Sequence, residues 1–359
     1  MNTFEEIFSE SKLDVVYRLD DPELWDLTFE RLFFRNVDYL QSTLDYQLAY
    51  QKSRGSVWHD FSCILRSNGE PIGLWAISLR LTNGIGEITS QGRPLMAPQF
   101  TDHCPTTTRK KYTKECFRVA NCLASSIAIK EWQSTSGFQG TCAFDDWHLL
   151  SMEQGARCFV HHELYVDLGM PIAKIKSHFR KSYRSLVNHG EKKWKIEILR
   201  SPGDTAIWDE FRMLHKTVAG RITRSSVSWH VQHEAIASDQ GFLVTLRDLH
   251  NRMIGAGYFM CSPDEGIYAV GAYDRSLFGT PVGHVVQYNA INELQRRGCK
   301  WHHIGTRVYP SDKPTPDGKE LNISYFKEGF ATHVLPKYTL TNSTKNSNTD
   351  NNQDFQIEN

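Results

Sequence analysis

The fold is decided by residues 251–306, which read NRMIGAGYFMCSPDEGIYAVGAYDRSLFGTPVGHVVQYNAINELQRRGCKWHHIGT. The expected elements, in chain order, are a strand over 252–260, a polar turn over 262–266, a strand over 267–273, a helix over 281–297 and a strand over 300–305. Pro281 is a favourable first residue for the helix, and Gly298 is a favourable stop. A hairpin followed by a helical crossover into another strand is an α/β core, which places reactive groups where strand ends meet helix starts.

The strand over 267–273 has large side chains in both of its alternating sets, so we expect it at the centre of the sheet. Gly271 interrupts this strand, and a glycine inside a strand often marks the close approach of a ligand or of another backbone. His284 and Tyr288 lie one helical turn apart near the start of the following helix. A glycine-broken strand beside a His-bearing helix start predicts an anion or acyl-carrier site, although a histidine with a structural role fits the same pattern equally well.

The bulk properties favour a two-domain cytoplasmic protein. The chain has 359 residues, which is long for one domain, and its 41 Lys and Arg equal its 41 Asp and Glu, so no DNA partner is expected. The eight cysteines include no Cys-x-x-Cys pair, which is typical of a reduced compartment. The adjacent histidines at 161–162 and 302–303 point to opposite faces of a strand, so we expect no metal site. The start of the chain does not resemble a signal peptide, and no apolar run is long enough to span a bilayer, which allows peripheral membrane contact at most.

Two similar hairpins indicate an internal duplication. One is expected from strands at 60–65 and 72–80, and the other from strands at 242–247 and 253–260. In both, a polar turn precedes a second strand that opens with Ile-Gly. Two such units about 180 residues apart suggest two halves of similar build, each with a mixed sheet flanked by helices.

A basic tract lies between the two halves. Residues 171–193 are expected to form a long helix, and Lys174, Lys181 and Arg184 recur along one face of it at helical spacing. Such a face is either simply solvated or a groove for phosphate groups carried by a substrate, and its position between the two halves favours the groove. A second cationic segment holds Arg221 and Arg224 beside Gly220 and hydroxyl residues, a composition that favours a binding loop.

Several motifs of the second half are familiar as a set: VAGRITR at 218–224, SW at 228–229, VGAYD at 270–274, PVGH at 281–284, IGTR at 304–307 and ISYFKEGF at 323–330. They resemble the GNAT-type acyltransferase domain of FemAB-like proteins, especially those encoded with bacterial surface-polysaccharide genes. The tract RKSYRSLVN at 180–188 is similar to the bridging element between the two GNAT-like halves of that family. The motif match covers about 171–340, whereas the first half matches only in shape.

The resemblance implies two tandem GNAT-like domains, at 1–170 and 171–340, with a bridging basic helix at 171–193. Because the chain from Thr341 on is mostly Asn, Thr, Ser and Asp, we expect 341–359 to be a disordered tail. The resemblance also implies transfer of an acyl or aminoacyl group to an amine, with acyl-CoA or aminoacyl-tRNA as donor. The acceptor would be a peptidoglycan precursor, or a nucleotide-linked or lipid-linked amino sugar. The CoA-pyrophosphate loop of GNAT enzymes is missing between Tyr273 and Pro281, which leaves the use of CoA open.

Acyl transfer needs a proton acceptor for the amine and a group that stabilises an oxyanion. By residue type, His284 is the first candidate for the base, and Tyr273 or Asp274 the next. Arg307 or Lys327 would bind a phosphate or the developing negative charge, and Arg221 and Arg224 would hold the donor or a nucleotide-linked acceptor. The other residues expected to bind substrate are Trp229, Gln232, Lys181, Arg184 and Tyr288.

Two alternatives stay open. One is a conventional sugar N-acetyltransferase that uses acyl-CoA, and CoA binding separates it from the first interpretation. The other is a tandem-GNAT scaffold that binds a glycan precursor without turnover, which the missing CoA loop favours.

Overall fold

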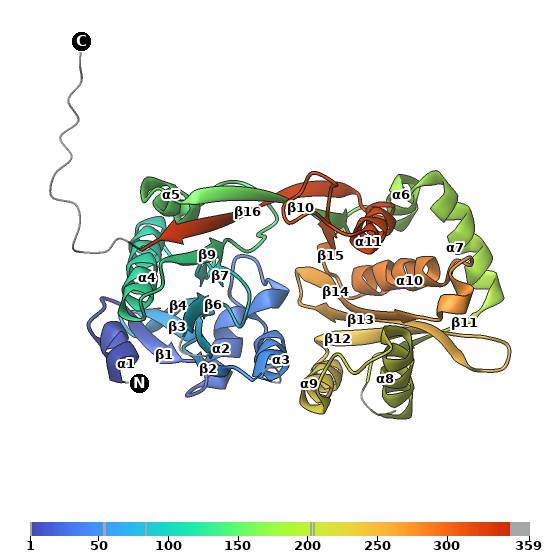
Figure 1. Ribbon diagram of the computed structural model, residues 1–359, viewed down its shortest axis with the longest axis horizontal. Coiled ribbons are helices and arrows are strands. Elements are labelled where there is room, and N and C mark those ends of the chain that lie inside the picture. The colour runs from blue at the N-terminus through green and yellow to red at the C-terminus, as the bar shows by residue number, and fades with distance from the viewer. Residues whose placement is uncertain (1, 53–54, 83–84, 202, 204, 345–359) are drawn as a thin grey trace, which may run out of the picture.

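The computed structural model describes residues 2–52, 55–82, 85–201, 203 and 205–344, and consists of two α/β halves side by side along the long axis (Figure 1). The first half is coloured blue to green and the second yellow to orange. Mixed sheets flanked by helices build both halves, which confirms the predicted fold class.

The sheet of the second half contains the three strands expected within residues 251–306, which are β13 (Met253–Cys261), β14 (Glu265–Tyr273) and β15 (Trp301–Arg307). β11 (Lys195–Leu199) and β12 (Gly241–Arg247) precede them in the chain and belong to the same sheet. Neighbouring strands pair antiparallel, except β14 and β15, which are parallel and connected by α10 (Val282–Arg296). β14 lies between β13 and β15, at the central position that its sequence predicted.

Helices cover both faces of this sheet (Figure 1). One face carries α10 together with α7, and the opposite face carries α8 (Thr205–Ala219) and α9 (Ser226–Ala237). Gly257 of β13 allows α10 to approach closely, because a Cβ at that position would lie 2.7 Å from Val286 Cγ1. This glycine therefore fixes the distance between the helix and the sheet.

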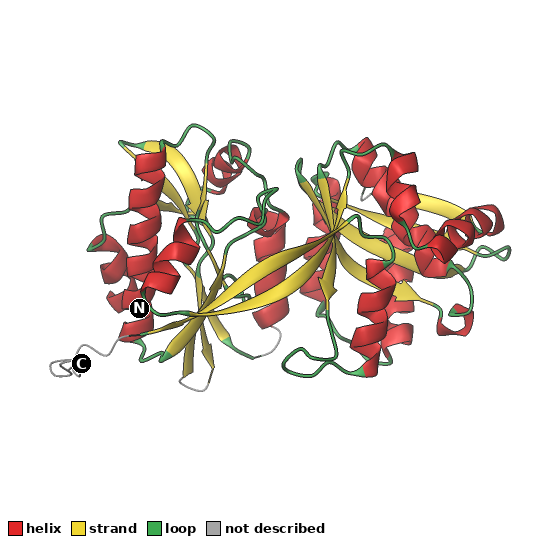
Figure 2. Ribbon diagram, turned by 90° about the horizontal axis from the view of Figure 1, so that it is seen from above, coloured by secondary structure: helices red, strands yellow, loops and turns green. Residues whose placement is uncertain are grey.

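Two long strands carry the sheet into the first half. β10 (Arg157–Asp167) pairs with β15 and, along most of its length, with β16 (His333–Ser343). β16 then pairs with β9 (Glu131–Thr135), and β7 (Leu95–Met96) completes the nine-stranded sheet. In Figure 2, β10 and β16 are the long yellow ribbons that cross between the two halves.

The first half adds two smaller sheets. One consists of β1 (Asp14–Tyr17), β3 (Cys63–Ser67), β4 (Glu70–Trp75) and β8 (Gln99–Phe100), and the other of β2 (Val57–Asp60), β5 (Ser78–Thr82) and β6 (Ile85–Thr89). Its helices are α1 (Asn2–Ser9), α2 (Pro22–Phe29), η1 (Val37–Tyr39), α3 (Gln41–Lys52), α4 (Thr106–Ser126) and α5 (Asp146–Glu153). α2, α3 and η1 pack Trp25, Tyr39 and Leu44 into one hydrophobic cluster with Trp208 and Tyr258, so the two halves share a core.

Both predicted hairpins form, as β3–β4 and β12–β13. Each carries a register irregularity just before its turn, at Leu65/Arg66 and at Leu246/Arg247. The strand predicted over 72–80 is wrong in its extent, because the chain leaves β4 after Trp75 and enters β5 of another sheet at Ser78.

The basic tract differs from the expected single helix. It forms α6 (Ile172–His178) and α7 (Lys181–Lys193), because Phe179 and Arg180 between them have extended backbone angles. Both helices lie on the second half (Figure 1), so the segments that cross between the halves are β10 and β16. The division of the chain near residue 170 stays a prediction.

The end of the chain also differs from the expectation. The expected tail begins inside β16, because Thr341–Ser343 still pair with β9, and residues 345–359 lie outside the described residues. The remaining elements, η2 (Arg275–Leu277) and α11 (Gly318–Glu328), follow β14 and β15 respectively.

Candidate active site between the halves

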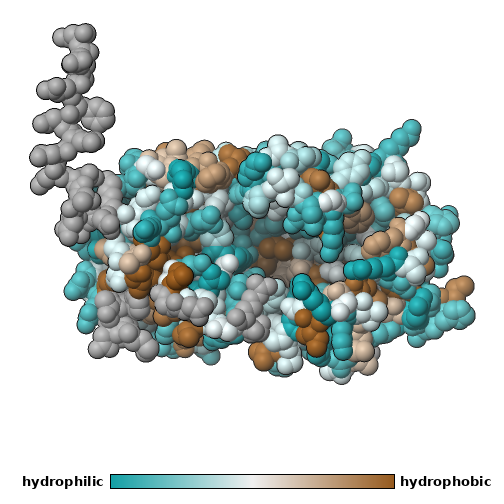
Figure 3. Space-filling model, in the orientation of Figure 1, coloured by the Kyte–Doolittle hydropathy of each residue, from teal (hydrophilic) through white to brown (hydrophobic). Residues whose placement is uncertain are grey.

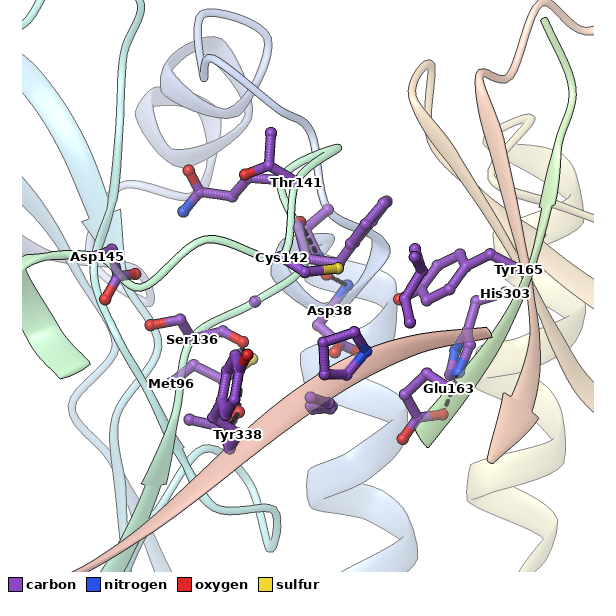
Figure 4. Close-up of a pocket in the computed structure, with 18 of the residues that line it drawn as sticks. Asp38, Met96, Ser136, Thr141, Cys142, Asp145, Glu163, Tyr165, His303 and Tyr338 are labelled. Carbon is purple, nitrogen blue, oxygen red and sulfur yellow. Dashed lines mark hydrogen bonds and ion pairs between the residues drawn. The ribbon is translucent and has the colours of Figure 1, made fainter. Parts of the chain in front are cut away.

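A cavity of about 380 Å³ lies where the two halves meet (Figure 4). One wall is the segment 136–145 of the first half, with Ser136, Thr141 and Cys142, and the opposite wall carries Glu163, Tyr165 and His303. Figure 3 shows a shaded recess in the surface between the two halves. Grooves between domains are common places for ligand sites.

Glu265, the first residue of β14, is a carboxyl group of this cavity that is 2% exposed. It accepts a hydrogen bond from the backbone N–H of Val37 at 3.1 Å, and no cation of the described residues forms an ion pair with it. Burial, with the neighbouring charge of Asp38, raises the pKa of Glu265 to about 8. A carboxyl group with such a pKa exchanges a proton near neutral pH, as general bases do.

Asp38 of η1 lies at the same cavity and forms an ion pair with Arg93. Burial opposes ionisation of Asp38, but Arg93, with Lys337 and His303, lowers its pKa below the ordinary value. Asp38 therefore ionises more readily than a free aspartate, and its negative charge disfavours ionisation of Glu265.

Glu163 of β10 binds two side chains of β15. It accepts hydrogen bonds from Thr306 Oγ1 at 3.1 Å and lies 2.7 Å from His303 Nε2. Burial opposes ionisation here too, but His303 lowers the pKa of Glu163. Tyr165 stacks on the His303 ring with centroids 4.9 Å apart, so the imidazole is held from two sides.

Lys337 of β16 lines the cavity and is half-buried. No carboxylate of the described part of the chain lies within ion-pairing distance of its Nζ. The cavity is thus lined by four carboxyl groups, those of Asp38, Asp145, Glu163 and Glu265, together with Lys337, a cation that a ligand can bind.

β14 and β15 part beside this cavity. They pair only from Glu265 to Ile267 and from Trp301 to His303, after which β14 follows β13 and β15 follows β10. Lys327 of α11 covers the place where the strands separate: its Nζ lies 5.5 Å above the Tyr268 ring, and a side chain at Gly305 would collide with it. Gly305 has a φ of +138°, which favours glycine.

Lys327 is a cation without an ion pair among the described residues. Burial lowers its pKa, and Glu163 opposes this shift. An ammonium group in such surroundings interacts strongly with a negative charge that develops nearby.

Tyr273, a predicted site residue, lies close to Lys327. Its hydroxyl is 2.9 Å from that of Tyr268, and burial raises the pKa of Tyr268 to about 12 and that of Tyr273 well above its ordinary range. Gly271 leaves room for the Tyr268 hydroxyl, because any Cβ at 271 would overlap it. Gly271 therefore makes room for the side chain of Tyr268 in the same strand, and not for the close approach of another backbone. The Gln287 amide is buried beside both tyrosine hydroxyls, where its hydrogen bonding opposes the rise of their pKa values. His302 Nε2 is buried without a partner in the described residues.

His284, the first candidate for the base, does not line the cavity between the halves. Its ring packs against Tyr183, Phe326 and Phe330, with centroids 4.3, 5.1 and 5.8 Å away. Burial, with the charge of Arg180, lowers the pKa of His284 to about 4, so the imidazole is neutral at pH 7. Its Nδ1 is buried without a partner in the described residues.

Other predicted residues already have partners in the fold. Asp274 caps η2 by accepting from Ser276 and lies 3.4 Å from Arg252, and the bonds from Ser276 lower its pKa. Arg307 binds Glu328 at 3.1 Å. Tyr288 lies further along α10, under Lys176 Nζ at 4.3 Å.

The residues predicted around Arg221 form a separate group on α9 and the segment before it. Arg224 donates to Tyr46 Oη of α3 at 3.0 Å, so it connects the two halves. Trp229 is part of the shared core, Gln232 is fully buried with both amide atoms unpartnered in the described residues, and Arg221 is exposed. Lys181 and Arg184 are exposed on α7.

The structure therefore brings Tyr273 and Lys327 together and separates them from the α9 group. Sequence reasoning missed Glu265, Asp38, Glu163, His303 and Lys337. One signal was present: Glu265 directly precedes an apolar strand, although the segment around it was interpreted as a polar turn. No local pattern connects Asp38 to residues more than 200 positions later in the chain.

Within the described residues, no three or more His, Cys, Asp or Glu side chains are arranged to hold a metal ion. No helix among these residues has both the length and the apolar composition needed to cross a membrane.

No protein-family model matches the sequence, and no curated protein matches it. Solved structures do match. FemX aligns with a TM-score of 0.65 at 10% identity, over 91% of this chain and 96% of that chain. L-PGS from Bacillus licheniformis aligns with a TM-score of 0.58 at 14% identity, over 91% of this chain and 93% of that chain. The C-terminal domain of a putative lysylphosphatidylglycerol synthetase from Agrobacterium fabrum aligns with a TM-score of 0.59 at 11% identity, over 88% of this chain and 89% of that chain. These alignments cover both halves, and the chain thus has the FemAB-like, GNAT-type fold that the sequence resemblance predicted.

Proposed function

We propose that this protein transfers an acyl or aminoacyl group from an activated donor to an amine that binds in the cavity between the halves. The observation that carries the proposal is Glu265, a buried carboxyl group with a pKa of about 8 at the wall of that cavity. The fold supports it, since lysylphosphatidylglycerol synthetase is by its name an enzyme that attaches a lysyl group.

An acceptor amine reaches the cavity mainly as an ammonium ion and must lose a proton before it can attack. Asp38 and Glu265 lie at the same cavity, and the ammonium charge favours the ionised form of Glu265. The Glu265 carboxylate then takes one proton, and the neutral nitrogen attacks the carbonyl carbon of the donor. Amide formation proceeds through a tetrahedral intermediate, whose C–O or C–S bond breaks. The donor's alcohol or thiol leaves with the second proton that the attacking nitrogen gives up.

The oxyanion of that intermediate needs a positive partner. Lys327 supplies it in our proposal: it does not line the cavity, but it is half-buried where β14 and β15 part beside the cavity, and it has no ion pair in the described residues. The proposal thus keeps the role predicted for Lys327 and moves the base from His284 to Glu265.

The substrates are proposed from the resemblance. The donor is acyl-CoA or aminoacyl-tRNA, and the acceptor is an amino sugar or a cell-envelope precursor linked to a nucleotide or a lipid. The reaction would take place in the cytoplasm.

The proposal is tested by incubating the protein with acyl-CoAs, charged tRNAs and nucleotide-linked amino sugars, and detecting acylated amines by mass spectrometry. Glu265→Gln keeps the shape of the side chain and removes the base, so we expect turnover to fall by about 100-fold or more. Glu153→Gln changes an exposed carboxylate of α5 outside the cavity and should not change turnover. Wild-type turnover in Glu265→Gln would contradict the proposal.

A further inference from the structure

A second cavity, of about 330 Å³, adjoins the first. Gln139, Phe144 and Asp145 line both cavities, so segment 136–145 separates them and touches a ligand in either one. The other walls of the second cavity are the first turns of α4 and α5, the segment 97–100 and Phe33.

Trp147 lines this cavity and carries an unused hydrogen-bond donor. Its side chain is 1% exposed, and its Nε1 is buried without a partner in the described residues. An indole N–H only donates, and a buried donor without an acceptor is costly. The group that completes it must therefore offer an acceptor atom.

Charges of both signs line this cavity, and one of its cations has no ion pair among the described residues. Arg109 and Lys110 project from the start of α4, and no carboxylate of the described residues pairs with Arg109. Of the two acidic side chains that also line it, Asp145 lies 2.7 Å from His148 Nδ1, and Asp146 lies 4.0 Å from Lys110 Nζ. An anion in this cavity can pair with the Arg109 guanidinium, and Trp147, with its free N–H donor, lines the same cavity.

Apolar groups surround these donors. Phe33, Phe144 and Leu149 line the cavity while 67%, 47% and 53% of their surfaces stay exposed. Such side chains can cover the body of a ligand whose polar end reaches Trp147.

We propose that the second cavity binds an oxyanion, a phosphate or a carboxylate, and that this group belongs to the acceptor whose amine enters the first cavity. The second clause rests on the proposed function; the binding of an oxyanion does not. The acceptor is then an elongated molecule with an ammonium group at one end and an acidic group at the other, lying along segment 136–145.

The test is calorimetric titration of the full chain with inorganic phosphate and, separately, with acetate at constant ionic strength. Removing two exposed charges by Arg109→Ala with Lys110→Ala should weaken binding about tenfold. Trp147→Phe keeps an aromatic ring and removes the N–H, so it should weaken binding about fivefold. Tighter binding of phosphate than of acetate assigns a phosphate group to the ligand, and the reverse assigns a carboxylate.

The matched control is Lys111→Ala with Lys114→Ala, which removes the same charge from exposed positions of α4 that do not line the cavity. This double variant should bind like the wild type. Absence of binding to the wild type, equal affinity in the Arg109/Lys110 variant, or an equal loss in the Lys111/Lys114 control would overturn the proposal. Phosphate binding with this pattern in a protein that transfers no acyl group would leave the anion site standing and remove the proposed function.

Discussion

Asp264 and Glu265 are adjacent acidic residues, both buried, with opposite behaviour. Asp264 accepts from Arg35 Nε at 2.7 Å and pairs with Lys300 at 2.7 Å, and although burial opposes ionisation, these partners lower its pKa. Among the described residues, the Glu265 carboxyl has only the Val37 N–H as a partner, so burial raises its pKa. Partners rather than burial decide which carboxyl group is structural and which one is able to accept a proton.

The pH dependence of the reaction should report Glu265. Because its pKa is about 8, the carboxylate forms only as pH rises through 8, and kcat/KM should increase about tenfold per pH unit below 8 and level off above it. The measurement is a pH–rate profile with a fixed donor and acceptor. A profile that levels off near pH 5 would contradict the assignment.

Stability should respond to the same group with the opposite slope. In the unfolded chain Glu265 ionises near pH 4.3, whereas the folded protein keeps its proton until about pH 8, so stability falls between these values by up to about 1.4 kcal/mol per pH unit. Glu265→Gln removes this loss. Urea unfolding of both proteins at pH 6 and pH 8 should therefore show the variant gaining relative to the wild type as pH rises.

Substitutions test the oxyanion role proposed for Lys327 and the base role predicted for His284 separately. Lys327→Met should lower kcat by about 100-fold if it stabilises the oxyanion, and Lys319→Met, an exposed position on the same helix, should have no effect.

If His284 or Tyr273 takes part in the proton transfer, as the sequence predicted, His284→Ala and Tyr273→Phe should lower turnover. Wild-type turnover in both variants would rule out that role and leave Glu265 as the candidate general base.

At the scale of elements, α10 is positioned by small residues on β13. A Cβ at Gly255 or Gly257 would meet Val282 or Val286, so the helix can lie close to the sheet only because both positions are glycine. The position of α10 also sets where Gln287 and His284 lie relative to β14. Packing on β13 therefore shapes the region where β14 and β15 part.

Gly257→Ala should force α10 away from the sheet and lower the free energy of unfolding by about 1–3 kcal/mol, because overpacking moves neighbouring side chains. Gly279→Ala is the control, since nothing lies within 4 Å of a Cβ at that position. Urea denaturation measures both. Equal stability of the two variants would show that α10 adjusts freely.

At the scale of the whole molecule, a shared hydrophobic core, two strands and an ion pair join the two halves. They share the hydrophobic cluster around Trp25 and Trp208, and β10 and β16 run through both (Figure 2). Arg35 of the first half binds Asp264 of the second through its backbone N–H at 2.8 Å and through its guanidinium. These contacts lie beside the cavity and hold its two walls together.

Asp264→Asn should destabilise the protein by about 1–3 kcal/mol, because it removes the charged hydrogen bonds to Arg35 and Lys300, while both cations stay accessible to water. The wild type should lose the same contribution in acid, as pH falls through the lowered pKa of Asp264. Thermal unfolding at pH 7 measures the first effect, with exposed Asp20→Asn as control. An unchanged melting temperature in Asp264→Asn would show that the pair does not join the halves.

The sequence by itself determined most of the elements of the second half and the kind of fold. Period-2 and helical patterns, Pro281 and Gly298 are local signals, so β13, β14, α10 and β15 were predictable to within a few residues. The same locality explains the errors at 72–80 and 171–193, where a short bend interrupts a continuous pattern.

Only the tertiary structure decided where the cavity lies and which acids line it. Asp38, Glu163, Glu265 and Lys337 come from four distant parts of the chain, and no spacing rule connects them. Their protonation depends on burial and on through-space neighbours, which exist only once β10 and β16 have brought the halves together. A sequence records residue types, but pKa values and unpaired charges are properties of three-dimensional surroundings.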